Sequence, residues 1–141
     1  MKASYDADFT QWATEQAALL KAGQTAGLDF ENLADEIECL SKKDKRALKS
    51  HLVILMLHLL KLQYQPDYDG KNSWVRSVNS SRRCIRALLK DSPSLVPLLP
   101  DYVNSEYEDA AESAGHEMGV FDLPEACPFT IDELLNPAFF P

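Results

Sequence analysis

Glycine is scarce in this chain of 141 residues, and the motifs that depend on it are missing. The five glycines are scattered, so there is no glycine-rich loop that could hold a phosphate through its backbone N–H groups. No Gly-x-Ser-x-Gly or other nucleophile context occurs either. The sequence therefore lacks a signature of nucleotide binding or of nucleophilic catalysis.

Cysteine is also sparse. Cys39, Cys84 and Cys127 lie far apart, with no Cys-x-x-Cys pair and no Cys/His pair at zinc-finger spacing. An odd, low count is typical of a reducing compartment. No apolar segment that would mark a signal peptide follows the first residues. We therefore expect a cytoplasmic protein.

Histidine gives no metal motif. His51 and His58 are seven positions apart, or about 10.5 Å along a helix, whereas two ligands of one ion need a spacing of three or four. One of them could still bind an ion together with a carboxylate from another helix, such as Glu36 or Glu38. Because no repeated Glu-x-x-His motif occurs, we expect neither a metal nor a cofactor.

Positive charge is absent from residues 93–141, which carry ten acidic side chains and no Lys or Arg. Residues 41–92 carry 12 basic and four acidic side chains, and residues 1–40 carry two basic and eight acidic ones. Such segregation indicates either a nucleic-acid surface or a basic middle segment packed between acidic flanks. We favour the second interpretation, because a chain with a net charge of −8 repels phosphate at long range.

The longest apolar run lies within Ala47–Gln65. It is too long for a typical buried strand and contains no helix breaker, so it predicts a central helix. Ser41 is the expected N-cap and Pro66 the expected stop. A membrane span is not expected, because four polar side chains interrupt the run. They are Lys49, His51, His58 and Lys61.

Apolar spacing predicts further helices at 6–22, 30–40, 74–90 and 100–118. Asp29 and Ser73 are the expected N-caps of the second and fourth helices, and a break near Ser41 separates the second helix from the central one. The second helix has one apolar face, made of Phe30, Leu33, Ala34, Ile37 and Leu40. The proline-rich tail, 120–141, contains several large apolar residues and a capping box from Thr130 to Glu133, so we expect it to be ordered. Together these patterns predict one all-α domain over 1–141, a bundle of about five helices around the central helix.

The central helix also has a polar stripe. His51, His58, Lys61 and Gln65 fall within about a quarter of a turn. Polar groups on a covered stripe need partners, so the stripe indicates a functional site, a structural network or a solvent-facing surface. If the second and central helices are antiparallel neighbours, Glu36 could place a carboxylate near His58.

An ordered set of residues resembles the bacterial family known as domain of unknown function 29 over nearly the full length. The set comprises Tyr5, Asp8, Phe9, Trp12, Asp29, Asn32, Leu33, Asp35–Glu38, Leu40, His58–Lys61, Gln65, Pro66, Ser73, Trp74, Arg82, Pro93–Leu95, Cys127–Phe129 and Asn136–Pro141. The chain departs modestly, with Asp35 where Glu is usual and Met118 in a segment that usually reads Glu-Thr-Gly. The resemblance implies an all-helical fold and no assigned activity. It draws attention to five polar residues as a candidate site: Glu36, His58, Lys61, Gln65 and Arg82.

Three functions remain open at this point. The leading hypothesis is a non-enzymatic binding module that contacts a protein partner or a second copy of itself. The second is an enzyme or metal-binding protein with a polar site between the second, central and fourth helices. The third is nucleic-acid binding through the basic residues of 42–49 and 82–90, for which aromatic residues are too few to favour it.

Overall fold

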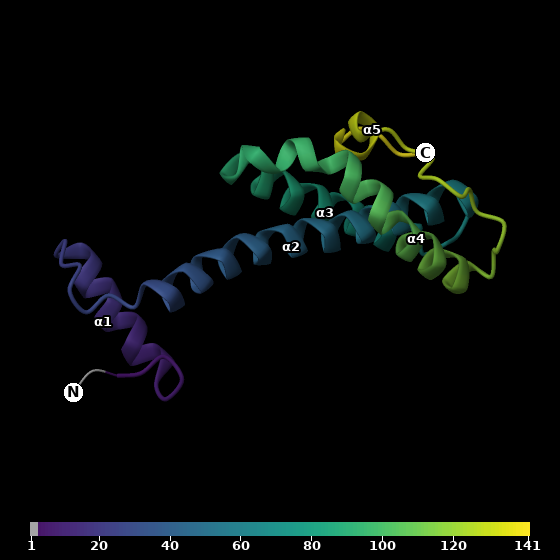
Figure 1. Cartoon of the computed structure of the whole chain (residues 1–141). Coiled ribbons are helices and arrows are strands. Elements are labelled where there is room, and N and C mark those ends of the chain that lie inside the picture. The colour runs from purple at the N-terminus through teal and green to yellow at the C-terminus, as the bar shows by residue number, and fades with distance from the viewer. Residues whose placement is uncertain (1–2) are drawn as a thin grey trace. The chain divides into compact units, whose positions relative to one another are not determined.

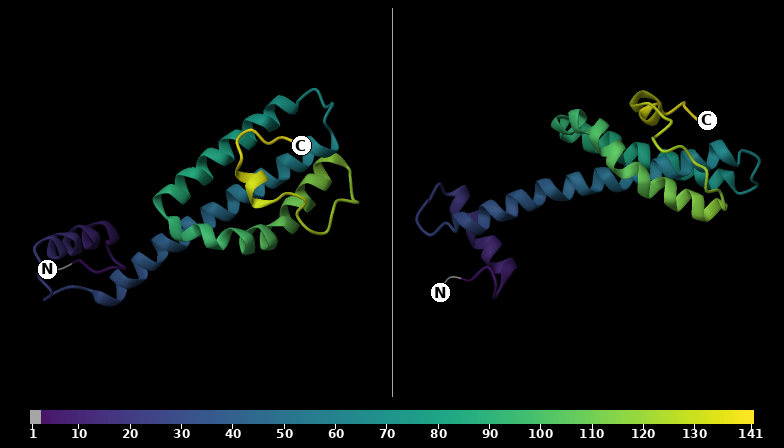
Figure 2. Two further views of the ribbon diagram at one scale, coloured as in Figure 1. Left: turned by 90° about the horizontal axis from the view of Figure 1, so that it is seen from above. Right: turned by 45° about the vertical axis from the view of Figure 1, so that its right-hand side comes forward.

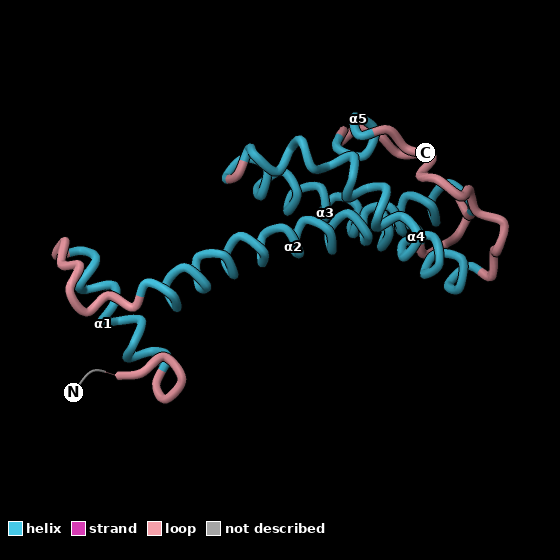
Figure 3. Tube along the Cα trace, viewed as in Figure 1, coloured by secondary structure: helices cyan, strands magenta, loops and turns pink. Residues whose placement is uncertain are grey.

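The computed structural model describes residues 3–141, and every regular element in that range is helical (Figures 1 and 3). The all-α prediction is confirmed. The elements are the helices α1 (Phe9–Lys21), α2 (Phe30–Tyr64), α3 (Lys71–Asp91), α4 (Leu99–Met118) and α5 (Ile131–Leu135), with the 3₁₀ helix η1 (Pro93–Leu98) between α3 and α4. The chain divides into two compact units, an N-terminal unit that ends at Lys43 and a C-terminal unit, Asp44–Pro141. A single-domain organisation stays a prediction.

A polar network joins α1 to the start of α2 in the N-terminal unit. Trp12 is buried, and its indole N–H donates to the Asp29 carboxylate at 3.1 Å. The buried Gln16 accepts from the backbone N–H of Asp29 at 2.8 Å and donates to the carbonyl of Gly27 at 3.4 Å. Asp29 caps α2, as predicted, by accepting from the backbone N–H of Asn32 at 3.3 Å. The amide side chain of Asn32 is the largest cause of the lowered pKa of Asp29.

The predicted break near Ser41 is wrong, because α2 runs through it without interruption. The segment around Ser41 contains no Gly or Pro and is rich in Lys and Arg, which are good helix formers. Glu38 and Lys42 also stand four positions apart in the order that favours a helix. Ser41 therefore lies inside α2 and caps nothing, and two of the predicted helices are one helix of 35 residues.

The part of α2 after Lys43 supplies the centre of the C-terminal unit. Six of its side chains are fully buried: Leu48, Leu52, Leu55, Met56, Leu59 and Leu60. Within this unit α2 runs between α3 and α4, as the view from above in Figure 2 shows. On α4 the buried residues include Ala110 and Ala114, whose small size allows close packing. The prediction of a central apolar helix is confirmed.

Apart from Ser41, the helix ends follow the sequence signals with one exception. Helix α2 ends at Tyr64, shortly before Pro66, and α4 ends at Gly119, which has the left-handed φ of +71° that glycine adopts without strain. Ser73 is not the cap of α3. The helix begins two residues earlier, at Lys71, and the Ser73 hydroxyl donates to the carbonyl of Gly70 at 2.8 Å.

The tail packs on the C-terminal unit through part of its apolar set. Phe129 and Leu134 are buried with the core residues of the helices. Thr130 and Glu133 form the predicted capping box of α5, with each side chain accepting from the backbone N–H of the other residue. Phe121, by contrast, is 80% exposed.

Candidate functional site

The five candidate polar residues do not form one cluster. Glu36 belongs to the N-terminal unit, where its carboxylate accepts a hydrogen bond from the Tyr5 hydroxyl. The other four belong to the C-terminal unit. The antiparallel pairing that would have brought Glu36 beside His58 does not occur, because both residues lie on the continuous helix α2, 22 positions apart. The hydrogen bond to Glu36 is the main cause that raises the pKa of Tyr5 to about 12.

Lys61 and Gln65 both contact the last turn of α4. Lys61 forms an ion pair with Glu117, and its ammonium lies 5.0 Å from the centre of the Trp74 ring. The Gln65 amide donates to the carbonyl of Met118 at 3.4 Å. The amide satisfies a free carbonyl group at the C-terminus of α4, and the cation complements the helix dipole. These two side chains are therefore used in joining α2 to α4.

His58 is half-buried on the same face of α2. Its Nδ1–H donates to the carbonyl of Ile54 at 2.7 Å. Burial lowers the pKa of His58, Lys61 lowers it further, and Glu117 opposes the shift. Burial thus disfavours the charged imidazole, while the hydrogen bond to Ile54 favours it, and both features are found in structural as well as functional histidines.

Arg82 on α3 holds the tail in place. It is only 2% exposed, and its guanidinium donates from Nε to the carbonyl of Leu134 at 2.8 Å and from Nη2 to the carbonyl of Glu133 at 3.0 Å. These two hydrogen bonds, called the Arg82 clamp below, satisfy carbonyls at the C-terminal end of α5. The guanidinium also lies 5.3 Å from the centre of the Phe140 ring. Burial lowers the pKa of Arg82.

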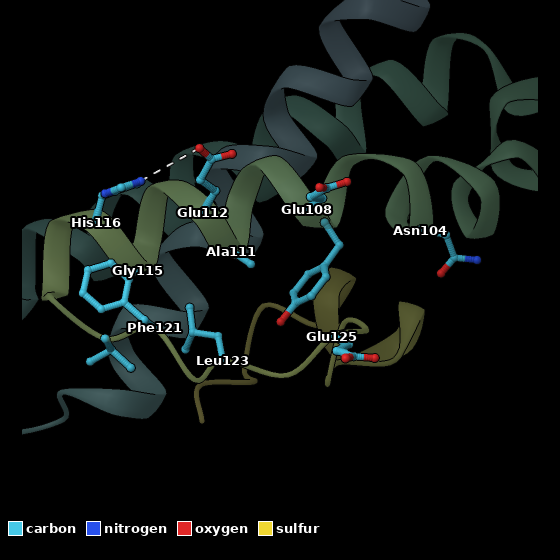
Figure 4. A pocket seen from close by; sticks show the side chains of 11 residues that line it. Asn104, Glu108, Ala111, Glu112, Gly115, His116, Phe121, Leu123 and Glu125 are labelled. Atoms are coloured by element: carbon cyan, nitrogen blue, oxygen red, sulfur yellow. Dashed lines mark ion pairs between the residues drawn. The ribbon is translucent and has the colours of Figure 1, made fainter.

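An acidic groove that sequence reasoning missed lies between α4 and the segment after Gly119 (Figure 4). Its volume is about 580 Å³, and its lining includes Tyr107, whose hydroxyl donates to the carbonyl of Pro124 at 2.7 Å. Glu112 and His116 lie 3.9 Å apart on its α4 side. The spacing of Glu108, Glu112 and His116 at every fourth position was the available signal in the sequence. No group of three or more potential ligands that could hold a metal occurs within residues 3–141.

The first part of α2 exposes most of its apolar face. Phe30 is 65% exposed, Ile37 66% and Leu40 65%, while Leu33 between them is half-buried. We call these four residues the α2 stripe. Their spacing of 3, 4 and 3 places them within about 80° of one another around the helix. An apolar helix face is normally covered, so the α2 stripe is the best candidate for a contact with another molecule.

The comparisons with known proteins define a relationship but no activity. A family model described as "Domain of unknown function DUF29" matches residues 4–140. No curated protein and no solved structure matches the chain. Among the described helices, none is both long enough and apolar enough to cross a membrane.

Proposed function

We propose, from the premise that this chain belongs to the DUF29 family, that it is a protein-interaction module which binds an amphipathic helix of a partner protein on the α2 stripe. The observation that carries the proposal is the exposure of Phe30, Ile37 and Leu40 by about two thirds each on one face of one helix. Heptad-like spacing is the pattern by which two helices pack side by side. The partner would therefore present its own apolar stripe.

The charge around the α2 stripe indicates which kind of partner helix would bind. Residues 29–40 contain five acidic side chains and no Lys or Arg. Glu31 and Glu38 each follow a stripe residue by one position, so they lie about 100° around the helix from Phe30 and Ile37. Basic residues beside the partner's apolar stripe would complement this surface and set the orientation of binding.

A second copy of the chain fits this surface poorly. Pairing one α2 stripe with another in register sets the acidic segment 31–38 against itself, whether the helices run parallel or antiparallel. Like charges across an interface disfavour that pairing. The proposal therefore commits to a different protein chain with a basic amphipathic helix.

The expected affinity is modest. Burying the exposed parts of three stripe side chains, with a similar set from the partner, contributes roughly 8 kcal/mol at about 2 kcal/mol per fully buried side chain. This gain is comparable to the cost of association, about 4–15 kcal/mol, so charge complementarity decides whether binding occurs. With the lowest cost, the apolar contact leaves about 4 kcal/mol, which corresponds to a dissociation constant on the order of 1 mM and to a transient contact.

Two synthetic helical peptides test the proposal. Both carry Leu and Ile at heptad positions a and d, and one has Lys at the flanking positions where the other has Glu. Titration of the isotopically labelled protein should move amide resonances of residues 30–40 with the Lys peptide alone. The double variant Ile37→Ser/Leu40→Ser should abolish these shifts, whereas Val96→Ser, at an exposed apolar position of η1, should leave them unchanged.

Charge reversal supplies the sharper arm of the experiment. The variant Glu31→Lys/Glu38→Lys should lose affinity for the Lys peptide and gain affinity for the Glu peptide. Equal binding of both peptides to the unchanged protein would refute the role of charge. Absence of binding to both peptides would overturn the proposed partner. So would a dimer of the unchanged protein that the variant Ile37→Ser/Leu40→Ser dissociates.

A further inference from the structure

A small cavity in the C-terminal unit is lined by three cationic side chains and no acidic one. Its volume is about 290 Å³, and its walls are Arg82, Arg86, Leu89, Lys90 and Leu135. The three cations stand at every fourth position of α3, so they form one row along the helix. Within residues 3–141 none of the three makes an ion pair with a carboxylate. The cavity therefore concentrates positive charge that the fold itself does not neutralise.

Arg82 offers an independent reason to place an anion beside α3. The two hydrogen bonds of the Arg82 clamp go to neutral carbonyl groups, and the guanidinium contacts the neutral Phe140 ring, so no carboxylate balances its charge. Its third nitrogen, Nη1, is buried and has no hydrogen-bond partner among the described residues. An unsatisfied buried donor on a charged group is costly. Because Nη1 is closed to solvent, an anion in the cavity would reach it after a shift of the Arg82 side chain. Arg82 itself lines the cavity.

The composition of the walls identifies the class of anion. Two guanidinium groups and one ammonium match the doubly charged, multi-oxygen phosphate better than a singly charged carboxylate. Leu89 and Leu135 add apolar surface that can contact a short carbon chain. The volume is close to the lower limit of small-molecule sites, about 300 Å³. We propose that this cavity binds the phosphate group of a small phosphomonoester, with Arg82, Arg86 and Lys90 as its ligands. The inference is independent of the α2 stripe, which lies in the other unit.

Isothermal titration with inorganic phosphate and with monobutyl phosphate tests the site on the full chain. Both should bind saturably at about 50 mM salt, and monobutyl phosphate should bind more tightly because it also contacts the two leucines. The double variant Arg86→Gln/Lys90→Gln should weaken binding about tenfold or more. The matched control is Arg76→Gln/Arg83→Gln, which removes the same charge from exposed positions of α3 outside the cavity and should change the affinity about twofold or less.

The role of Arg82 is tested by NMR on the unchanged protein, because a mutation of Arg82 would also release the tail. Phosphate should shift the side-chain nitrogen resonance of Arg82 in the unchanged protein, and the shift should saturate with the calorimetric curve. Three outcomes would overturn the proposal: no saturation up to about 10 mM phosphate, equal weakening by the two double variants, or binding of acetate as tight as that of phosphate. Absence of saturation would mean that the cavity binds no phosphate. Equal weakening would mean that phosphate is attracted by the overall charge of α3, and tight binding of acetate would mean that the site prefers a carboxylate.

Discussion

Removing the Arg82 clamp should loosen the tail more than it destabilises the rest of the C-terminal unit. The variant Arg82→Met keeps a long apolar stem beside Leu134 and loses both hydrogen bonds to the α5 carbonyls. Hydrogen bonds from a charged donor contribute about 1.5–3 kcal/mol each. Replacing the buried guanidinium also removes its desolvation cost, which amounts to several kcal/mol and offsets part of the loss. We expect a net loss of about 1–3 kcal/mol, concentrated in the docking of residues 129–140.

Hydrogen exchange measures that loss where it occurs. A change of this size should accelerate amide exchange in α5 and the residues around it about 5–150-fold, while the core amides of α2 keep their protection. Arg83→Met is the matched control, because Arg83 is the neighbouring residue and is exposed. It should change the free energy of unfolding by about 0.5 kcal/mol or less. Unchanged exchange in the tail, or an equal acceleration in α2, would show that Arg82 acts through the packing of α3 instead.

Two further predictions concern pH. Burial lowers the pKa of His58 below its ordinary 6.5, so the folded state takes up fewer protons than the unfolded state. The C-terminal unit should therefore lose stability as the pH falls below 6.5, and urea titrations of His58→Gln should show a weaker dependence. Tyr5 has its pKa raised to about 12, so its contribution to the N-terminal unit is complete below pH 10 and is lost as the pH rises through about 12. In Glu36→Gln, NMR of labelled tyrosine should find the Tyr5 midpoint lowered toward 10, and an unchanged midpoint would contradict the assigned hydrogen bond.

Local sequence signals predicted the helix ends that depend on one residue or one pair. Asp29 and the Thr130–Glu133 capping box act as their residue types require. The predicted helix start at Ser41 was wrong, because the same capping pattern is compatible with a helix interior. Whether a helix stops there depends on the propensities of the whole segment, and adding one residue to an existing helix is easier than starting a new one. The continuous α2 was therefore decided by the sum over many residues, which a single capping signal does not report.

The sequence predicted the α2 residues of the candidate site but not the residues that they contact. Periodicity placed Lys61 and Gln65 on one face of a helix, and their partners, Glu117 and Met118, lie more than 50 positions away in the sequence. Long-range contacts of this kind follow from packing, which periodicity does not encode. The prediction for the tail is limited in the same way. Its apolar residues indicated order, but only packing separates the buried Phe129 from the exposed Phe121.

The segregated charges form few ion pairs inside the fold, and this argues that they act between molecules. If the basic residues of 44–92 served mainly to pack against the acidic residues of 93–141, many of these cations would contact carboxylates. Within the C-terminal unit, Lys61 alone of them forms an ion pair, and Arg82 donates to carbonyl groups instead. The acidic start of α2 and the basic row of α3 thus keep their charges available at the surface and in the cavity. A basic partner helix and a phosphate are the ligands that those two unpaired sets of charges would attract, and each can be tested without the other.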